Sequence, residues 1–228
     1  MESEEIISRL SMLSQKYHSV QQELSDTYHF DEWIDARINV FKHCYLVIDS
    51  TYLIFLARVT NFRDEAWWAN LMDRHLISRG MTKDQQDVFI KGFDHFVPSA
   101  YITMLFVAIE NAFRTFYMSV FSKDPPIKFH IVYKELLQEF NLEKYIDLLK
   151  IVSYIRNSFH NNGRHTLDDD EVPWEGVTYH FEKGKNVVLK SVWQVLTDLT
   201  TGIYEMLVKL VKSDTILKKK EIIDASAV

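Results

Sequence analysis

The sequence contains a single cysteine, and this scarcity excludes two kinds of protein. Cys44 has no partner for an internal disulfide, and a cysteine-based metal site cannot assemble around one thiol. Because Cys44 lies in an apolar stretch, we expect a small buried thiol rather than a nucleophile. The chain must therefore rely on a packed core, for which 228 residues are sufficient.

Glycine and proline are also scarce, with 6 and 4 residues respectively. A many-stranded sheet needs the turns that these residues supply, so their scarcity argues against one. Hydrophobic residues make up 47% of the chain and aromatic residues 14%. This composition excludes wholesale disorder and provides large side chains for a core. We expect an all-α protein.

Several common functional motifs are absent. The sequence has no GxxxxGK[ST] phosphate loop, no GxGxxG, no HExxH and no GxSxG. The acidic run 168–171 lacks the spaced ligands and central glycine of a calcium loop, so it is interpreted as a solvated loop. We therefore expect neither a metal nor a cofactor.

The charge balance and the apolar stretches bear on partners and location. A net charge of -6 argues against broad duplex binding, although a small basic cleft for one or two phosphates remains compatible with it. The acidic start, residues 1–5, lacks the order of a secretion signal. The apolar stretches 44–59 and 101–121 carry charged residues, which favours core helices over membrane spans. The predicted location is cytoplasmic.

Helical spacing of apolar residues predicts a bundle with one domain, residues 1–228. Pro98 and Ser99 are expected to open the strongest helix, since proline suits a first helical turn. Thr82 is the predicted N-cap of a separate helix before it. The expected helices cover residues 2–24, 31–61, 67–72, 82–96, 98–121, 128–140, 142–160 and a last long helix capped by Ser191. The tail, 214–228, is expected to fray.

One small β-hairpin is predicted before the last long helix. Residues 177–181 alternate between apolar and polar, the Lys-Gly-Lys run 183–185 resembles a turn, and 187–189 is the expected returning strand. Residues 166–171 are predicted to form an acidic loop. Trp174 and Trp193 flank this region and are expected to pack the hairpin onto the bundle.

A polar cluster near residue 160 carries the candidate chemistry. Arg156 and His160 are four residues apart, so on a helix they share one face. A guanidinium can hold a phosphate oxygen, and an imidazole can move the proton of a ribose 2′-hydroxyl or a leaving oxygen. Asn157 would donate to phosphate or orient the imidazole ring. None of these roles requires a metal.

A structural interpretation of the same residues remains open. Arginine and histidine one turn apart also occur by chance, and His160 in a last helical turn is well placed to meet the helix dipole. Asn161, the neighbouring Asn162 and Gly163 are predicted to end the helix, since they tolerate a left-handed backbone.

The run RNSFHNNG, together with the preceding helix that carries ENAFR from Glu110 to Arg114, resembles the Arg-Asn…His signature of the HEPN superfamily. The resemblance covers about residues 99–212, which places a HEPN-like core at 98–213 and a helical extension at 1–97. It implies a helical bundle that is commonly dimeric. It also implies that Arg156 binds phosphate, that His160 is catalytic, and that Asn157, Glu110 and Asn161 support them.

Two functions follow from the resemblance. The first is a metal-independent endoribonuclease of a toxin–antitoxin or antiviral defence system, which cuts RNA by the 2′-hydroxyl route and has a cognate antitoxin or defence partner. The family usually leaves four to six residues between arginine and histidine, whereas three separate Arg156 from His160. The alternative is therefore a non-catalytic module that binds a nucleotide or mediates dimerisation. A helical protein unrelated to this superfamily is the third interpretation.

Overall fold

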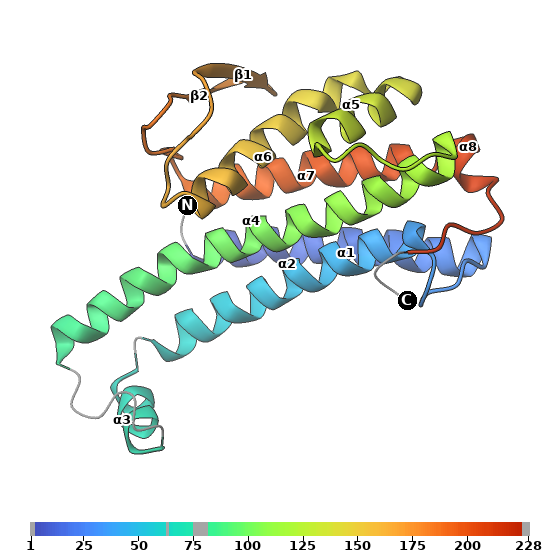
Figure 1. Ribbon diagram of the computed structural model, residues 1–228. Helices are drawn as coiled ribbons and strands as arrows, with labels where there is room; N and C mark the ends of the chain where they lie inside the picture. Colours follow the sequence, from blue (N-terminus) through green and yellow to red (C-terminus); the bar gives the residue numbers. More distant parts are fainter. Residues whose placement is uncertain (1–2, 63, 75–81, 225–228) are drawn as a thin grey trace.

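The computed structural model describes residues 3–62, 64–74 and 82–224, and it is an all-α bundle with one two-stranded hairpin, as predicted (Figure 1). In chain order the elements are α1 Ser3–Tyr28, α2 Ala36–Asn61, α3 Glu65–Arg74, α4 Lys83–Phe121, α5 Phe129–Glu139, the short 3-10 helix Glu143–Tyr145, α6 Ile146–His160, β1 Asp170–Trp174, β2 Val177–Phe181, α7 Val192–Val211 and α8 Asp214–Leu217.

Four long helices, α1, α2, α4 and α7, run along the bundle, and α5, α6 and the hairpin lie against one side of it (Figure 1). A continuous apolar core joins them, and its members come from every long helix. Tyr17, Phe41, Phe113 and Leu148 are among the fully buried side chains. Each of them removes a large apolar surface from water, which is the main source of stability in such a bundle.

Local sequence signals explain several helix ends. Thr82 and Gln85 form a reciprocal capping box at the start of α4, and this confirms the predicted N-cap. At the end of α6, Asn162 and Gly163 have positive φ angles of 55° and 83°. The amide of Gly163 donates to the carbonyl of Ser158 at 2.8 Å, which satisfies one of the last carbonyls of the helix. The predicted end of this helix is confirmed.

The predicted break before Pro98 is wrong, because α4 is one continuous helix of 39 residues with Pro98 inside it. Proline removes one backbone donor and crowds the carbonyl four residues earlier. The side chains of Val97, Pro98 and Tyr101 are nevertheless buried. The packing of these residues therefore outweighs the local preference of proline to start a helix.

The start of α2 also differs from the prediction. The helix begins at Ala36, and Asp35 is its N-cap, with a carboxylate that accepts from the amide of Arg37 at 2.9 Å. Asp31 lies before this helix and accepts from the amide of Trp33 at 2.8 Å. The N-cap is therefore Asp35, and Asp31 instead closes a local turn before the helix.

The hairpin pairs different strands from those predicted. β1 and β2 are antiparallel, with Val172 opposite Tyr179, and they are joined at Glu175 and Gly176, whose φ angles are 46° and 77°. Two positive φ angles suit the tight turn that joins twisted strands. The acidic run thus enters a strand at Asp170, and the predicted return at 187–189 is wrong. Near that segment, one isolated bridge joins Arg164 to Asn186.

The two tryptophans near the hairpin pack in different places. Trp174 lies against Tyr145, with ring centroids 5.8 Å apart, and a Cβ on Gly202 of α7 would approach its ring to 2.9 Å. Trp174 therefore packs the hairpin onto the bundle, as expected. Trp193 instead contacts Phe55 of α2 and Tyr101 of α4, so it anchors the start of α7.

By length and composition alone, α2 and α4 are apolar enough to cross a membrane. The most apolar windows of the two helices are 33% and 56% buried within the structure. A core helix of a soluble protein meets the same test, and α4 fits this description better than α2 does.

Candidate ligand-binding cleft

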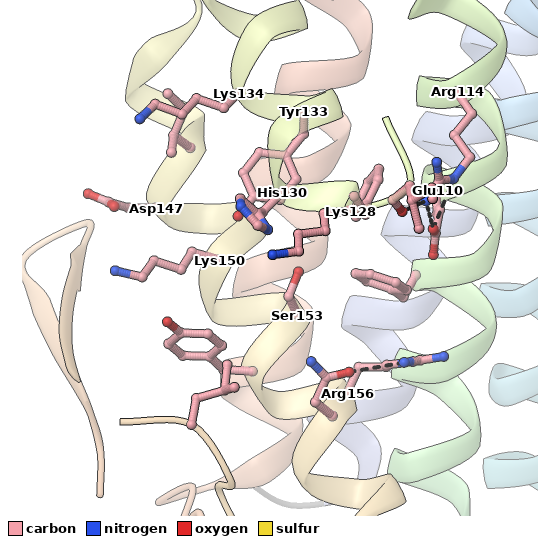
Figure 2. A pocket seen from close by; sticks show the side chains of 17 residues that line it. Glu110, Arg114, Lys128, His130, Tyr133, Lys134, Asp147, Lys150, Ser153 and Arg156 are labelled. Atoms are coloured by element: carbon pink, nitrogen blue, oxygen red, sulfur yellow. Dashed lines mark hydrogen bonds and ion pairs between the residues drawn. The ribbon is translucent and has the colours of Figure 1, made fainter. Parts of the chain in front are cut away.

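A cleft of about 700 Å³ lies between α4, the start of α5 and α6 (Figure 2). Helix α4 contributes Phe106, Glu110 and Arg114 to its lining. The other lining residues come from the α4–α5 loop, from α5, from α6 and from the loop after α6: they are Ile127, Lys128, Phe129, His130, Tyr133, Lys134, Ile146, Asp147, Lys150, Ser153, Tyr154, Arg156, Asn157 and Leu167.

The cleft is basic, although the whole chain is acidic. Its lining includes five lysine or arginine residues and two carboxylates, in a chain of net charge -6. The cations are Arg114, Lys128, Lys134, Lys150 and Arg156, and the carboxylates are Glu110 and Asp147. Like charges gathered in a concave site raise the local concentration of oppositely charged ligands. The arrangement therefore favours an anion.

One of these cations, Arg114, already has a carboxylate and two backbone carbonyls of the protein as partners. Its guanidinium pairs with Glu110 at 2.6 Å on the same face of α4 and donates to the carbonyls of Pro126 and Ile127 at 2.8 and 2.9 Å. These bonds hold the loop that carries Lys128 against α4. Glu110 and Arg114 thus form the plain ion pair that their spacing allows, and they position one wall of the cleft.

A second group of contacts holds the opposite wall. Asp170 of β1 pairs with Lys150 at 2.7 Å and accepts from the hydroxyl of Tyr154 at 2.8 Å. The Lys150 hydrogen bond, helped by Tyr154, lowers the pKa of Asp170 below its ordinary value. Burial is the main reason that the pKa of Tyr154 is raised. The hairpin is therefore tied to α6 by a carboxylate that stays ionised.

Arg156 differs from both groups because no described carboxylate pairs with it. One Nη donates to Asn157 Oδ1 at 3.0 Å, and the guanidinium lies over the Phe106 ring at 5.2 Å, turned towards α4 (Figure 2). Its Nε is buried and has no acceptor. A buried donor left in this state costs roughly 1–3 kcal/mol. An anionic oxygen that drew the guanidinium outward would relieve this cost.

Three further side chains at the cleft are available to a ligand. Lys128, His130 and Lys134 are exposed, and none of them forms an ion pair or a side-chain hydrogen bond within the described part of the chain. They lie at and just after the start of α5 and line the same cleft as Arg156. Together with Arg156, Lys128 and Lys134 provide charged donors that no described protein group neutralises.

The lining of the cleft includes only some of the residues that the sequence placed together. Arg156, Asn157 and Glu110 line the cleft, whereas His160 does not. His160 is the exposed last residue of α6 and has no side-chain partner among the described residues. Asn161 donates from Nδ2 to the carbonyl of Asn157 at 2.7 Å, so its amide closes the helix end.

His130 is one of several cleft residues that sequence patterns did not predict. It lies 26 positions before Arg156, on another helix, and no spacing rule connects the two. Only the packing of α5 on α6 brings them to the same cleft. In the described residues, no group of three or more histidine, cysteine or acidic side chains is arranged to hold a metal ion.

The fold and the cleft define an all-α bundle with a basic pocket. Comparison with protein-family models, with curated proteins and with solved structures finds no match. The resemblance to the HEPN superfamily is therefore carried by the motif residues alone, and it stays a prediction.

Proposed function

We propose that the cleft binds the phosphates and bases of a nucleotide ligand, in the form of a short single-stranded RNA segment. The proposal rests on one observation: the Arg156 guanidinium has no carboxylate partner among the described residues, and it lines a cleft with Lys128 and Lys134. Arginine is well suited to a phosphate because its planar donors match two phosphate oxygens.

The uncharged part of the lining favours a nucleotide over a simple inorganic anion. Tyr154 is half-buried at the cleft, Ile127 and Leu167 are exposed at it, and Phe106 underlies the guanidinium of Arg156. Aromatic and apolar groups next to cations suit nucleic acid strands, since bases stack on them while phosphates meet the charges. A volume of about 700 Å³ is also typical of ligand pockets.

Binding is tested with a fluorescent single-stranded RNA of about eight nucleotides, measured by anisotropy, with a mononucleotide and inorganic phosphate as competitors. Arg156→Met should weaken RNA binding, because the substitution keeps length and removes charge. Arg164→Met is the matched control, since Arg164 is an exposed arginine outside the cleft. Equal binding by the parent and both variants would contradict the proposal. Competition by phosphate alone would assign the cleft to simple anions.

A second candidate function, RNA cleavage, is favoured by the presence of an imidazole in the same cleft as Arg156. In this reaction the ribose 2′-oxygen attacks phosphorus as a base takes its proton, and the 5′-oxygen leaves with a proton. The products are a 2′,3′-cyclic phosphate and a 5′-hydroxyl. His130 would be the proton-transferring group, and Arg156 would stabilise charge on the phosphorane oxygens.

Cleavage is tested in EDTA with RNA and with the same strand carrying 2′-deoxyribose. Loss of cutting in His130→Ala, with cutting kept in His160→Ala, would support His130 as the histidine of the cleft. The opposite pattern would restore the motif pair Arg156 and His160. RNA binding without cutting by the parent would leave the binding function alone.

A further inference from the structure

The unpaired charges of the cleft bear on the kind of phosphate that fits there. Two of its cations, Arg114 and Lys150, already form ion pairs with carboxylates. The charged lining groups that form no ion pair within the described part of the chain are three cations and one carboxylate: Lys128, Lys134, Arg156 and Asp147. With His130 counted as neutral, three cations against one carboxylate leave a surplus of two positive charges. A ligand with two negative charges would balance this surplus.

The phosphates of a nucleic acid strand differ in charge according to their position. A phosphodiester inside the strand carries one negative charge. A phosphomonoester at the end of a strand carries nearly two at pH 7, and it has three terminal oxygens that accept hydrogen bonds. The surplus in the cleft therefore matches the end of a strand better than an internal linkage.

The start of α5 adds to the positive character of the cleft. Lys128 is the N-cap residue of α5 and makes no side-chain cap bond, and His130 lies in the first turn. Both residues line the cleft, and in the view of Figure 2 they lie between Lys150 and Arg156. Amides of a first helical turn carry partial positive charge. The helix start and the unpaired cations therefore attract negative charge to the same cleft.

The size of the cleft also favours a strand end. Its volume of about 700 Å³ is typical of a pocket that encloses one small ligand. Tyr154 is half-buried at the lining and Leu167 is exposed there, so the terminal base has apolar surface to contact beside the cations. A pocket of this size holds the end of a strand and leaves the rest of the strand outside.

We propose that the cleft binds the terminal phosphomonoester of an RNA strand, and that Lys128 gives it preference for the strand end over an internal phosphate. The inference rests on the proposed function, because it names the part of the RNA that enters the cleft. Lys128 is exposed and unpaired at the start of α5, so it supplies the charge that the second negative charge of a phosphomonoester needs. The 5′ and 3′ ends offer the same chemistry, and the experiment distinguishes them.

The test uses four RNAs of about eight nucleotides with one sequence and an internal fluorophore, measured by anisotropy. Their ends are a 5′-phosphate, a 3′-phosphate, hydroxyls only, and a 5′-phosphate methyl ester. The methyl ester keeps the phosphate and removes one charge. We expect one of the two phosphate-ended strands to bind about tenfold more tightly than the hydroxyl-ended strand. A gain confined to one end identifies the end that enters the cleft, and the methyl ester at the 5′ end should bind like the hydroxyl-ended strand.

Two lysine variants assign the preference to a side chain. Lys128→Met keeps most of the length and removes the charge, so it should abolish most of the tenfold gain. Lys91→Met is the matched control, because Lys91 is an exposed lysine of α4 outside the cleft, and it should keep the gain. Circular dichroism checks that both variants fold.

Equal binding of all four strands by the parent would overturn the inference. The proposed function would then still stand, provided that Arg156→Met weakens binding. A methyl ester that binds as tightly as the 5′-phosphate, when that end gives the gain, would also overturn the inference, as would a gain that persists in Lys128→Met. Failure of the proposed function has a different signature: no strand binds, or Arg156→Met binds every strand as the parent does.

Discussion

Two arginines on helices of this protein, Arg37 and Arg156, have opposite surroundings. Arg37 is fully buried, pairs with Asp35, donates to the carbonyls of Ile216 and Lys219 at 3.0 and 2.7 Å, and lies 3.4 Å from the centre of the Phe30 ring. Arg156 has a single side-chain hydrogen bond and a buried Nε without an acceptor.

The difference separates a structural arginine from one available to a ligand. Arg37 joins the start of α2 to the end of α8 and the chain beyond it, where Ala36 also donates to the carbonyl of Ile222 at 2.8 Å. The Arg37 guanidinium is paired with a carboxylate and with backbone carbonyls of the same chain. The Arg156 guanidinium has no carboxylate partner among the described residues, although α6 and Phe106 hold the side chain in place. Substitutions at the two sites should therefore affect different properties.

The largest expected effect is on stability, from Arg37→Met. The substitution leaves the carboxylate of Asp35 buried without its partner and frees three backbone carbonyls at the end of α8. Removing one member of a buried ion pair costs roughly 3–5 kcal/mol. Urea unfolding followed by circular dichroism measures the loss. A change below about 1 kcal/mol would show that Arg37 is not the structural arginine of this pair.

The second effect is on binding, from Arg156→Met. Loss of a charge-assisted contact to phosphate should weaken RNA binding about ten- to a hundredfold, or about 1.4–2.8 kcal/mol. Stability should change by less than about 1 kcal/mol, since the loss of one part-buried hydrogen bond to Asn157 is offset by the removal of one unmet buried donor. The same urea and anisotropy measurements serve both arginines. A large loss of stability here would remove the contrast with Arg37.

A third substitution, Asp170→Asn, tests the wall of the cleft. It should lower the stability of the protein by about 1 kcal/mol at pH 7, because the bonds to Lys150 and Tyr154 are partly exposed. The pKa of Asp170 is lowered in the folded state. Its contribution is therefore fully present above its ordinary pKa of 3.8 and is lost as the pH falls through the lower folded pKa.

The pH dependence supplies the check on Asp170. Unfolding of the parent and of Asp170→Asn should differ at pH 7, and the difference should shrink below about pH 3.8. A difference that stays constant into acid would mean that the carboxylate charge is not responsible.

The smallest effect is expected for Lys134→Ala. Lys134 is exposed and unpaired, so its removal should leave stability unchanged and weaken RNA binding about two- to fivefold. One phosphate contact fewer should also reduce the salt dependence of binding to a single strand by about 0.7 in the log–log slope. Lys16→Ala, an exposed lysine on α1, is the control. An unchanged slope would place Lys134 outside the ligand path.

Much of the secondary structure was predictable from short stretches of sequence. The Thr82 capping box and the end of α6 at Asn162 and Gly163 depend on interactions within about one helical turn. Residue types alone can therefore predict both features. Arg156 was likewise predictable as a phosphate-binding candidate from residue type and position. It lines the cleft beside Asn157.

Other features depend on contacts between distant segments. Proline favours a helix start, yet Pro98 lies inside α4, where Val97, Pro98 and Tyr101 are buried against the rest of the bundle. The strand partner of β2 depends on the Glu175–Gly176 turn and on burial of Val172, rather than on alternation alone. Sequence spacing linked His160 to Arg156, whereas the cleft that Arg156 lines includes His130 and not His160.

The sequence by itself determined that this protein is helical and where several of its helices end. Those properties follow from propensities, caps and periodicity, which act over a few residues. Only the tertiary structure decided which cations gather around Arg156, which arginine is already neutralised, and which apolar side chains remain exposed on α2 and α4. The reason is physical: charge pairing and burial depend on neighbours that are far away along the chain and close in space.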